Sequence, residues 1–202
     1  MKLRHNLDVM HIEKNICDYI LATFLGLVGK SKDNINARLD LDDMGIRKKL
    51  HLRHDGKSYS VPQAPYTMDK AQKQAFCDFI RSVKFPDGFA SNIETHITTD
   101  GCNLQGLKSH DCHILMQQLL LVALRGLLPD DVTSILFDLC GYFRELNTKV
   151  LYIDDLEKLE ERIIMTLCRM EMIFSPGFFT MMVHLVLHLA TEEKIGGPVC
   201  YR

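Results

Sequence analysis

The sequence predicts an all-α protein: a helical bundle of about six to eight helices with one irregular segment, at about residues 88–107. Apolar residues recur at spacings of three and four through most of the chain, which is the period of one helix face. The alternation of apolar and polar residues that indicates half-buried strands is almost absent. With 47% hydrophobic and 25% charged residues, the composition is that of an ordinary globular protein.

The first predicted helix runs from Val9 to about Val28, with Gly29 as a suitable helix stop. We expect its apolar face to pack on neighbouring helices, or otherwise to drive association. Residues 31–50 predict one or two short helices, with Asp40 and Asp42 as candidate N-caps.

Residues 51–67 predict a connection, because Asp55-Gly56 and two prolines interrupt any helical pattern there. We place the most favourable boundary in this connection. It divides the chain into a helical segment, residues 1–60, and a helical domain, residues 61–202.

The second segment predicts a helix over residues 69–83, followed by the irregular segment, in which residues 97–101 are compatible with a short extended piece. Four helices follow, over about residues 109–128, 130–146, 154–170 and 178–193. Ser109 is the expected cap of the first, and Asp154 with Glu157 resembles a capping box for the third. Ser175-Pro176 suits the start of the last, and Gly196-Gly197-Pro198 suits its end.

Neither the charge nor the cysteine content identifies a binding partner. The net charge is −2, so no global positive field attracts nucleic acid. Residues 1–60 carry a net +3 and residues 61–202 a net −5. The seven cysteines are scattered and odd in number, which favours a reducing compartment. No apolar run is long enough to cross a bilayer, so we expect no membrane contact, and no small-molecule substrate is indicated.

Two histidine groups have a superficial likeness to metal sites. His110-Asp111-Cys112-His113 follows Cys102 but contains no Cys-x-x-Cys pair. His184 and His188 have the spacing of a zinc protease helix, yet Leu185 stands where that motif has its glutamate. We expect the first group to be a polar helix start and the second to lie on the polar edge of a buried helix, with no metal at either.

A short basic cluster is the candidate DNA contact. It consists of Arg47, Lys48, Lys49 and Arg53, whose charges suit phosphate groups. It lacks the interleaved aromatic residues of single-strand binders, so a solvated helix end is the alternative and the favoured interpretation.

The opening stretch, residues 5–15, is dense in polar groups, including Asp8 and Glu13. Five residues on a helix separate two side chains by about 140° around the axis. The two acids cannot easily bind one ion from a regular helix, so at most one of them is a metal ligand.

The sequence of this stretch, HNLDVMHIEKN, resembles the C-terminal segment of the transposase of plant CACTA (En/Spm-type) DNA transposons. Later blocks resemble the same transposase or the plant domain of unknown function that follows it. These blocks are KDN at 32–34, ARLD at 37–40, DMGIR at 43–47, AFC at 75–77, FPDG at 85–88, GLKSHDCH at 106–113, RGLLP at 125–129 and GGPV at 196–199.

Such transposases are thought to cut DNA with an RNase H-like core that uses acidic residues and divalent metal. The resemblance makes Glu13 the candidate for the final catalytic acid. It also implies a nuclear protein whose partners are DNA or other transposase chains. The other acids and the sheet of that core are expected upstream of Leu3.

Two functions therefore compete. One is a transposon-derived helical accessory or interaction domain, which is not an enzyme alone and needs no cofactor. The other is part of an active transposase, which binds element DNA or completes a Mg²⁺-dependent nuclease site. An unrelated helical binding protein is disfavoured by the number of matching blocks.

Overall fold

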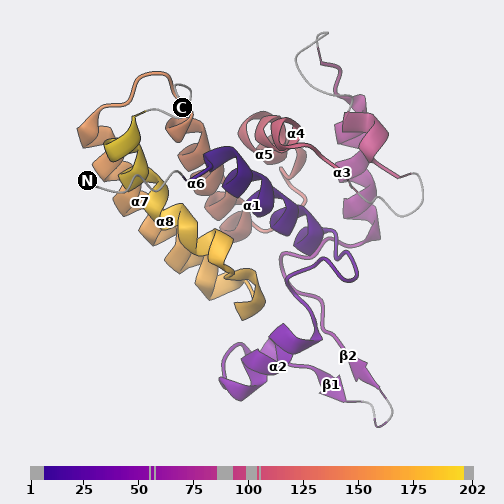
Figure 1. Cartoon of the computed structure of the whole chain (residues 1–202). Coiled ribbons are helices and arrows are strands. Elements are labelled where there is room, and N and C mark those ends of the chain that lie inside the picture. The colour runs from indigo at the N-terminus through magenta and orange to yellow at the C-terminus, as the bar shows by residue number, and fades with distance from the viewer. Residues whose placement is uncertain are drawn as a thin grey trace.

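A computed structural model describes residues 7–54, 56, 58–85, 93–98, 104 and 106–197. In this part of the chain helices dominate and the only sheet has two short strands, which confirms the predicted all-α class. Figure 1 shows most helices gathered in one bundle, with α2 and the strands projecting from its lower end.

The helices of the bundle occupy most of the described chain. α4 continues through a π-helical turn, η3, into α5, so the described residues contain seven continuous helices. The bounds are α1 (Val9–Phe24), α2 (Ile35–Asp43), α3 (Lys70–Ser82), α4 (Ser109–Ile114), η3 (Leu115–Leu119), α5 (Leu120–Ala123), α6 (Asp130–Leu146), α7 (Ile153–Ile173) and α8 (Met181–Gly196).

Short elements connect these helices. Strands β1 (Arg53–His54) and β2 (Tyr59–Ser60) pair antiparallel, within the stretch predicted as a plain connection. The 3₁₀ turns are η1 (Lys48–Leu50), η2 (Ile93–His96) and η4 (Pro176–Phe178). Ile97 and Leu104 form an isolated bridge, consistent with a short extended piece in the irregular segment. Residues 86–92, 99–103 and 105, also in or beside that segment, lie outside the described residues.

Several predicted caps are wrong by a few residues. Asp40 and Asp42 lie inside α2, whose N-cap is Asn34. Ser109 is the first residue of α4, after Lys108. Asp154 lies in the first turn of α7, where its charge favours the positive end of the helix dipole instead of capping it.

Other helix ends follow from local chemistry. The Asp8 carboxylate accepts a hydrogen bond from the His11 N–H at 2.9 Å and caps α1. This helix ends at Phe24, four residues before the predicted end, because Gly26 adopts a left-handed conformation with φ of 60°. Gly197 ends α8, as predicted, with φ of 81°.

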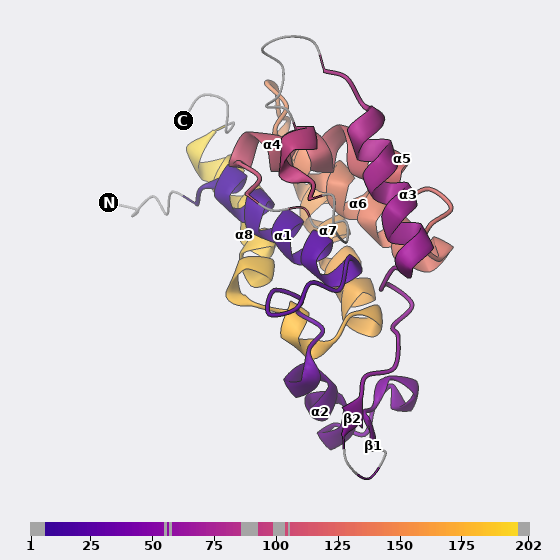
Figure 2. The ribbon, with the colours of Figure 1, turned by 90° about the vertical axis from the view of Figure 1, so that its right-hand side faces the viewer.

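The first helix packs inside the bundle, as expected from its apolar face. α1 lies against α4 and α8, and α7 lies between α6 and α8 in the packing order (Figure 2). Ile12, Ile16 and Ile20 of α1 are buried in the same hydrophobic core as α6 and α8. The segments on either side of residue 60 thus share one core, and the division of the chain there into two domains stays a prediction.

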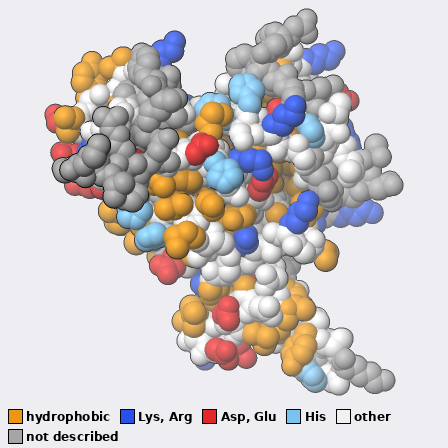
Figure 3. Space-filling model, viewed as in Figure 1, with side chains coloured by type: hydrophobic (Ala, Val, Ile, Leu, Met, Phe, Trp, Pro, Cys, Tyr) orange, Lys and Arg blue, Asp and Glu red, His pale blue; other side chains and the backbone are white. Residues whose placement is uncertain are grey.

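α2, η1 and the two strands form a separate protrusion, called below the α2–hairpin projection. Figure 3 shows hydrophobic side chains on its surface. The exposed large hydrophobic residues of these elements and their flanking turns include Ile35, Leu39, Met44, Ile46 and Tyr59. None of the described helices combines the length and the hydropathy that a bilayer crossing requires.

Candidate functional site

Glu13, the acid that the resemblance implies as catalytic, lies on the inner face of α1 and is 0% exposed. Its Oε2 atom is 2.8 Å from Nδ1 of His113 on α4. Its Oε1 atom accepts a hydrogen bond of 3.3 Å from Nε2 of Gln117 on η3. The carboxylate therefore bridges two segments that are about a hundred residues away in sequence, and both of its oxygens have a partner.

The His113 ring is the hydrogen-bond partner of one of these carboxylate oxygens. The hydrogen bond to Glu13 raises the pKa of His113 above its ordinary value of 6.5, against the opposing effect of burial. Since Nδ1 of His113 donates to Glu13, it cannot also accept from Gln117, whose Nε2 lies 3.0 Å away. The Gln117 amide thus serves the second carboxylate oxygen, and the buried charge is satisfied.

The π-helical turn places Gln117. A π turn holds one more residue than an α turn and shifts the side chains that follow it. Here it spans Leu115–Leu119 and includes Gln117, whose amide meets the carboxylate that His113 also contacts. No pattern in the sequence indicated this turn or a pairing between residues so far apart.

Buried thiols lie in the same part of the core as Glu13. Cys17 on α1 and Cys112 on α4 are both buried and free, and the contact with Cys112 together with burial raises the pKa of Cys17. Burial, with a smaller contribution from Glu13, raises the pKa of Cys140 to about 12. With raised pKa values, the Cys17 and Cys140 thiols are poor nucleophiles at neutral pH. Cys77 differs in being disulfide-bonded, which departs from the expectation of reduced thiols.

The basic cluster is only partly assembled. Arg47, Lys48 and Lys49 line a pocket of about 460 Å³ together with Asp131 and Met172, whereas Arg53 lies on β1 and is not among the lining residues. The Arg47 guanidinium donates to the backbone carbonyl of Phe174, which ties the α2–hairpin projection to the end of α7. Lys48, Lys49 and Arg53 are exposed and are the members available to a phosphate.

Arg38 is the only buried Lys or Arg among the residues that the structure describes, and no sequence pattern predicted its burial. It is 1% exposed, and its Nε and Nη2 atoms donate to the two Asp33 oxygens at 2.5 and 2.6 Å. Its other bonds go to the carbonyls of Leu50 and Pro62, at 2.8 and 3.2 Å. The only sequence feature that could have indicated this ion pair is the Asp-x-x-x-x-Arg spacing around an Asn cap. This spacing is too common to be diagnostic.

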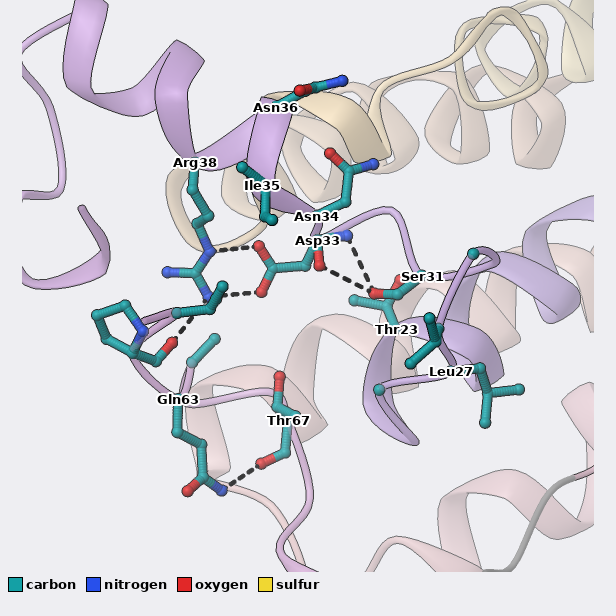
Figure 4. A pocket seen from close by; sticks show the side chains of 16 residues that line it. Thr23, Leu27, Ser31, Asp33, Asn34, Ile35, Asn36, Arg38, Gln63 and Thr67 are labelled. Atoms are coloured by element: carbon teal, nitrogen blue, oxygen red, sulfur yellow. Dashed lines mark hydrogen bonds and ion pairs between the residues drawn. The ribbon is translucent and has the colours of Figure 1, made fainter. Parts of the chain in front are cut away.

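Arg38 and Asp33 form part of the wall of a pocket of about 670 Å³ (Figure 4). Thr23, Leu27 and Gln63 contribute other parts of the wall. Because the guanidinium is already bound by a carboxylate and two carbonyls, it has little capacity to hold an anion in this pocket. Its arrangement indicates a structural brace.

The described residues contain no group of three or more His, Cys, Asp or Glu side chains arranged to hold a metal ion. His113 is engaged by Glu13, and Cys102, considered with it in the sequence, lies outside the described residues. Asp8 is exposed and caps α1. His184 and His188 lie on the exposed side of α8, on the polar edge that the sequence predicted.

Comparison with known families gives one match. Residues 146–202 match the model of a domain of unknown function, DUF4218. This segment begins at the last residue of α6 and includes α7 and α8. No curated protein and no solved structure matches the chain.

Proposed function

We propose that the chain is a transposon-derived helical accessory or interaction domain of a CACTA-type transposase, and that it does not cut DNA alone. The observation that carries the proposal is the environment of Glu13. A catalytic carboxylate must present its oxygens to a metal ion and substrate. Those of Glu13 are 0% exposed and held by His113 and Gln117, which suits a structural role.

Two further features support this interpretation. The sequence blocks that resemble the transposase and its following domain extend through most of the chain. The DUF4218 match over residues 146–202 includes the last of these blocks, GGPV at 196–199. The α2–hairpin projection exposes hydrophobic side chains such as Met44, which is 59% exposed, and clustered exposed apolar residues often mark contacts with other proteins. The partner in this proposal is the transposase chain that carries the RNase H-like core, in the nucleus.

The catalytic part is tested by incubating the purified chain with element-end DNA and Mg²⁺. We expect no cleavage. Mg²⁺-dependent cleavage that disappears in Glu13→Gln would overturn the proposal.

The interaction part is tested by sedimentation of the chain mixed with the transposase core. We expect a complex that is weakened by Met44→Asp on the projection. Val122→Asp on α5 is the matched control, because Val122 is 57% exposed and lies off the projection. Failure to form a complex, or equal weakening by both variants, would contradict the proposal.

The alternative function is DNA binding or completion of the nuclease site within an active transposase. It is favoured by the exposure of Lys48, Lys49 and Arg53, which leaves their charges free to approach phosphates. If these residues contact DNA, log affinity falls linearly with log salt, and each lost phosphate contact reduces the slope by about 1. The double variant Lys48→Gln, Lys49→Gln should then reduce the slope by about 2.

A further inference from the structure

We propose that His184 and His188, for which the sequence predicted no metal, form a binding site for a divalent transition-metal ion, such as Zn²⁺, on the exposed face of α8. The two residues are four apart on one helix and are both exposed. Their Nε2 atoms are 3.3 Å from each other, and their rings meet edge to face at 74°. The two nitrogens that would be ligands thus already converge.

The separation of these nitrogens is the one that tetrahedral coordination requires. Zn²⁺ binds imidazole nitrogen at roughly 2.0–2.1 Å, so two ligands at the tetrahedral angle are separated by roughly 3.4 Å. The observed 3.3 Å matches this separation, so the rings need only reorient their lone pairs toward the ion. α8 is packed against α1 and α7, so its backbone holds the pair in place.

The chemistry of the pair selects the kind of ion. Two imidazoles suit Zn²⁺, Cu²⁺ or Ni²⁺, whereas Mg²⁺ and Ca²⁺ prefer oxygen ligands. In the metal-free pair one Nε2 donates a proton to the other, so at least one ring is neutral. On binding, Nε2 of the donor ring loses its proton to water; a neutral ring takes one up at Nδ1, whereas a charged ring already carries one there, and both Nε2 lone pairs are then on the ion.

No third protein ligand completes the site among the described residues. The nearby charged group is Glu160 on α7, whose pKa is lowered mainly by Lys194 and Thr191 and to a lesser degree by His188. Its oxygens accept hydrogen bonds from Thr191 and Lys194 at 2.8 and 2.9 Å. Glu160 therefore adds a favourable charge while water fills the remaining coordination positions.

The test is a Zn²⁺ and Ni²⁺ titration of the full chain, followed by imidazole NMR signals and by thermal stability. Cys168→Ser is the background, because Cys168 is a free, exposed thiol that could bind the same ions. We expect saturable binding of one ion, perturbed His184 and His188 signals, and a higher melting temperature. Mg²⁺ should produce none of these changes.

Matched variants decide whether this pair is the site. His184→Asn and His188→Asn should each lower affinity by at least about tenfold, because the second ligand of a chelate binds intramolecularly. His110→Asn removes another exposed histidine and should leave the affinity unchanged. Absence of saturable binding, binding that survives loss of both residues, or an equal loss in His110→Asn would overturn the proposal.

Discussion

The bundle and the α2–hairpin projection each enclose a charged side chain, and they stabilise it differently. In the bundle, Glu13 is held by His113 and Gln117, which come from a distant part of the sequence. In the projection, Arg38 is held by the carboxylate of Asp33, five residues away, and by two backbone carbonyls. The first network joins two helices across a core, and the second joins a helix to the loops beside it.

The bundle and the α2–hairpin projection therefore depend on different contacts for their stability. The Glu13 network adds to a core that α1 already shares with α4 and α8, so hydrophobic packing remains if the network is lost. The α2–hairpin projection has few buried apolar residues, namely Ala37, Leu41 and Leu50. We therefore expect the projection to depend far more on its buried charge than the bundle does.

The largest effect is expected from Arg38→Met. It leaves Asp33 buried without its cation and removes the bonds to the Leu50 and Pro62 carbonyls, which should cost about 3–5 kcal/mol of unfolding free energy. Urea denaturation measures the loss, and hydrogen exchange should locate it in residues 33–62. The double variant Arg38→Met, Asp33→Leu should recover part of the stability. Equal protection of the projection in variant and wild type would contradict its dependence on Arg38.

A smaller effect is expected where the projection meets the bundle. A Cβ at Gly177 would lie 2.7 Å from the Lys32 carbonyl oxygen and 3.1 Å from the Ala37 side chain. Gly177→Ala should therefore cost about 1–3 kcal/mol, as measured by urea denaturation. Gly141→Ala is the control, because its nearest atom, on the flexible Arg162 side chain, is 3.8 Å away. That variant should be neutral or should stabilise α6 by up to about 1 kcal/mol.

The Glu13 network is expected to contribute less than Arg38 does. Glu13→Gln keeps the shape but removes the charge that faces His113, and should cost about 1–2 kcal/mol. The raised pKa of His113 gives a sign to the pH dependence. When the pKa of a group is higher in the folded state than in the unfolded state, the group stabilises the fold fully at pH values below its unfolded-state pKa. This stabilisation is lost as the pH rises through the folded-state pKa. The gap between wild type and variant should be larger near about pH 6 than near about pH 9, and an unchanging gap would contradict the pairing.

The last prediction concerns the reactivity of the thiols and involves no change in stability. Cys168 is exposed, whereas Cys17, Cys112 and Cys140 are buried with raised pKa values for Cys17 and Cys140. An alkylating reagent should label Cys168 rapidly in the folded chain and the other three only after unfolding. Peptide mass spectrometry checks this order. Rapid labelling of Cys17 would contradict the burial of the Glu13 region.

Helix periodicity was sufficient to predict the fold class, because apolar residues recur at helical spacing in α1, α6 and α7. The β1–β2 hairpin was missed because its strands have two residues each, too few to show an alternation. Caps at Asp154 and Ser109 were misplaced because a helix start depends on which neighbouring residue reaches an extended conformation.

The candidate site was less predictable than the fold. Helix geometry limited the opening stretch to at most one metal-binding acid, and the resemblance made Glu13 the candidate, which stays a prediction. Neither could supply the partners of Glu13, since His113 and Gln117 meet it only through packing. The basic cluster was visible as a run of charges, yet the use of Arg47 as a brace depends on Phe174, a residue distant in sequence. Arg38 was passed over because one arginine in a polar helix gives no sign of its burial.

The most direct test of the account is an NMR pH titration of His113 in the wild type and in Glu13→Gln, each with and without Mg²⁺. We expect a pKa above 6.5 in the wild type, a lower pKa in Glu13→Gln, and no response to Mg²⁺, because the carboxylate is bound within the protein. A wild-type pKa at or below 6.5, or a His113 titration that Mg²⁺ shifts only when Glu13 is present, would contradict a structural role for this acid.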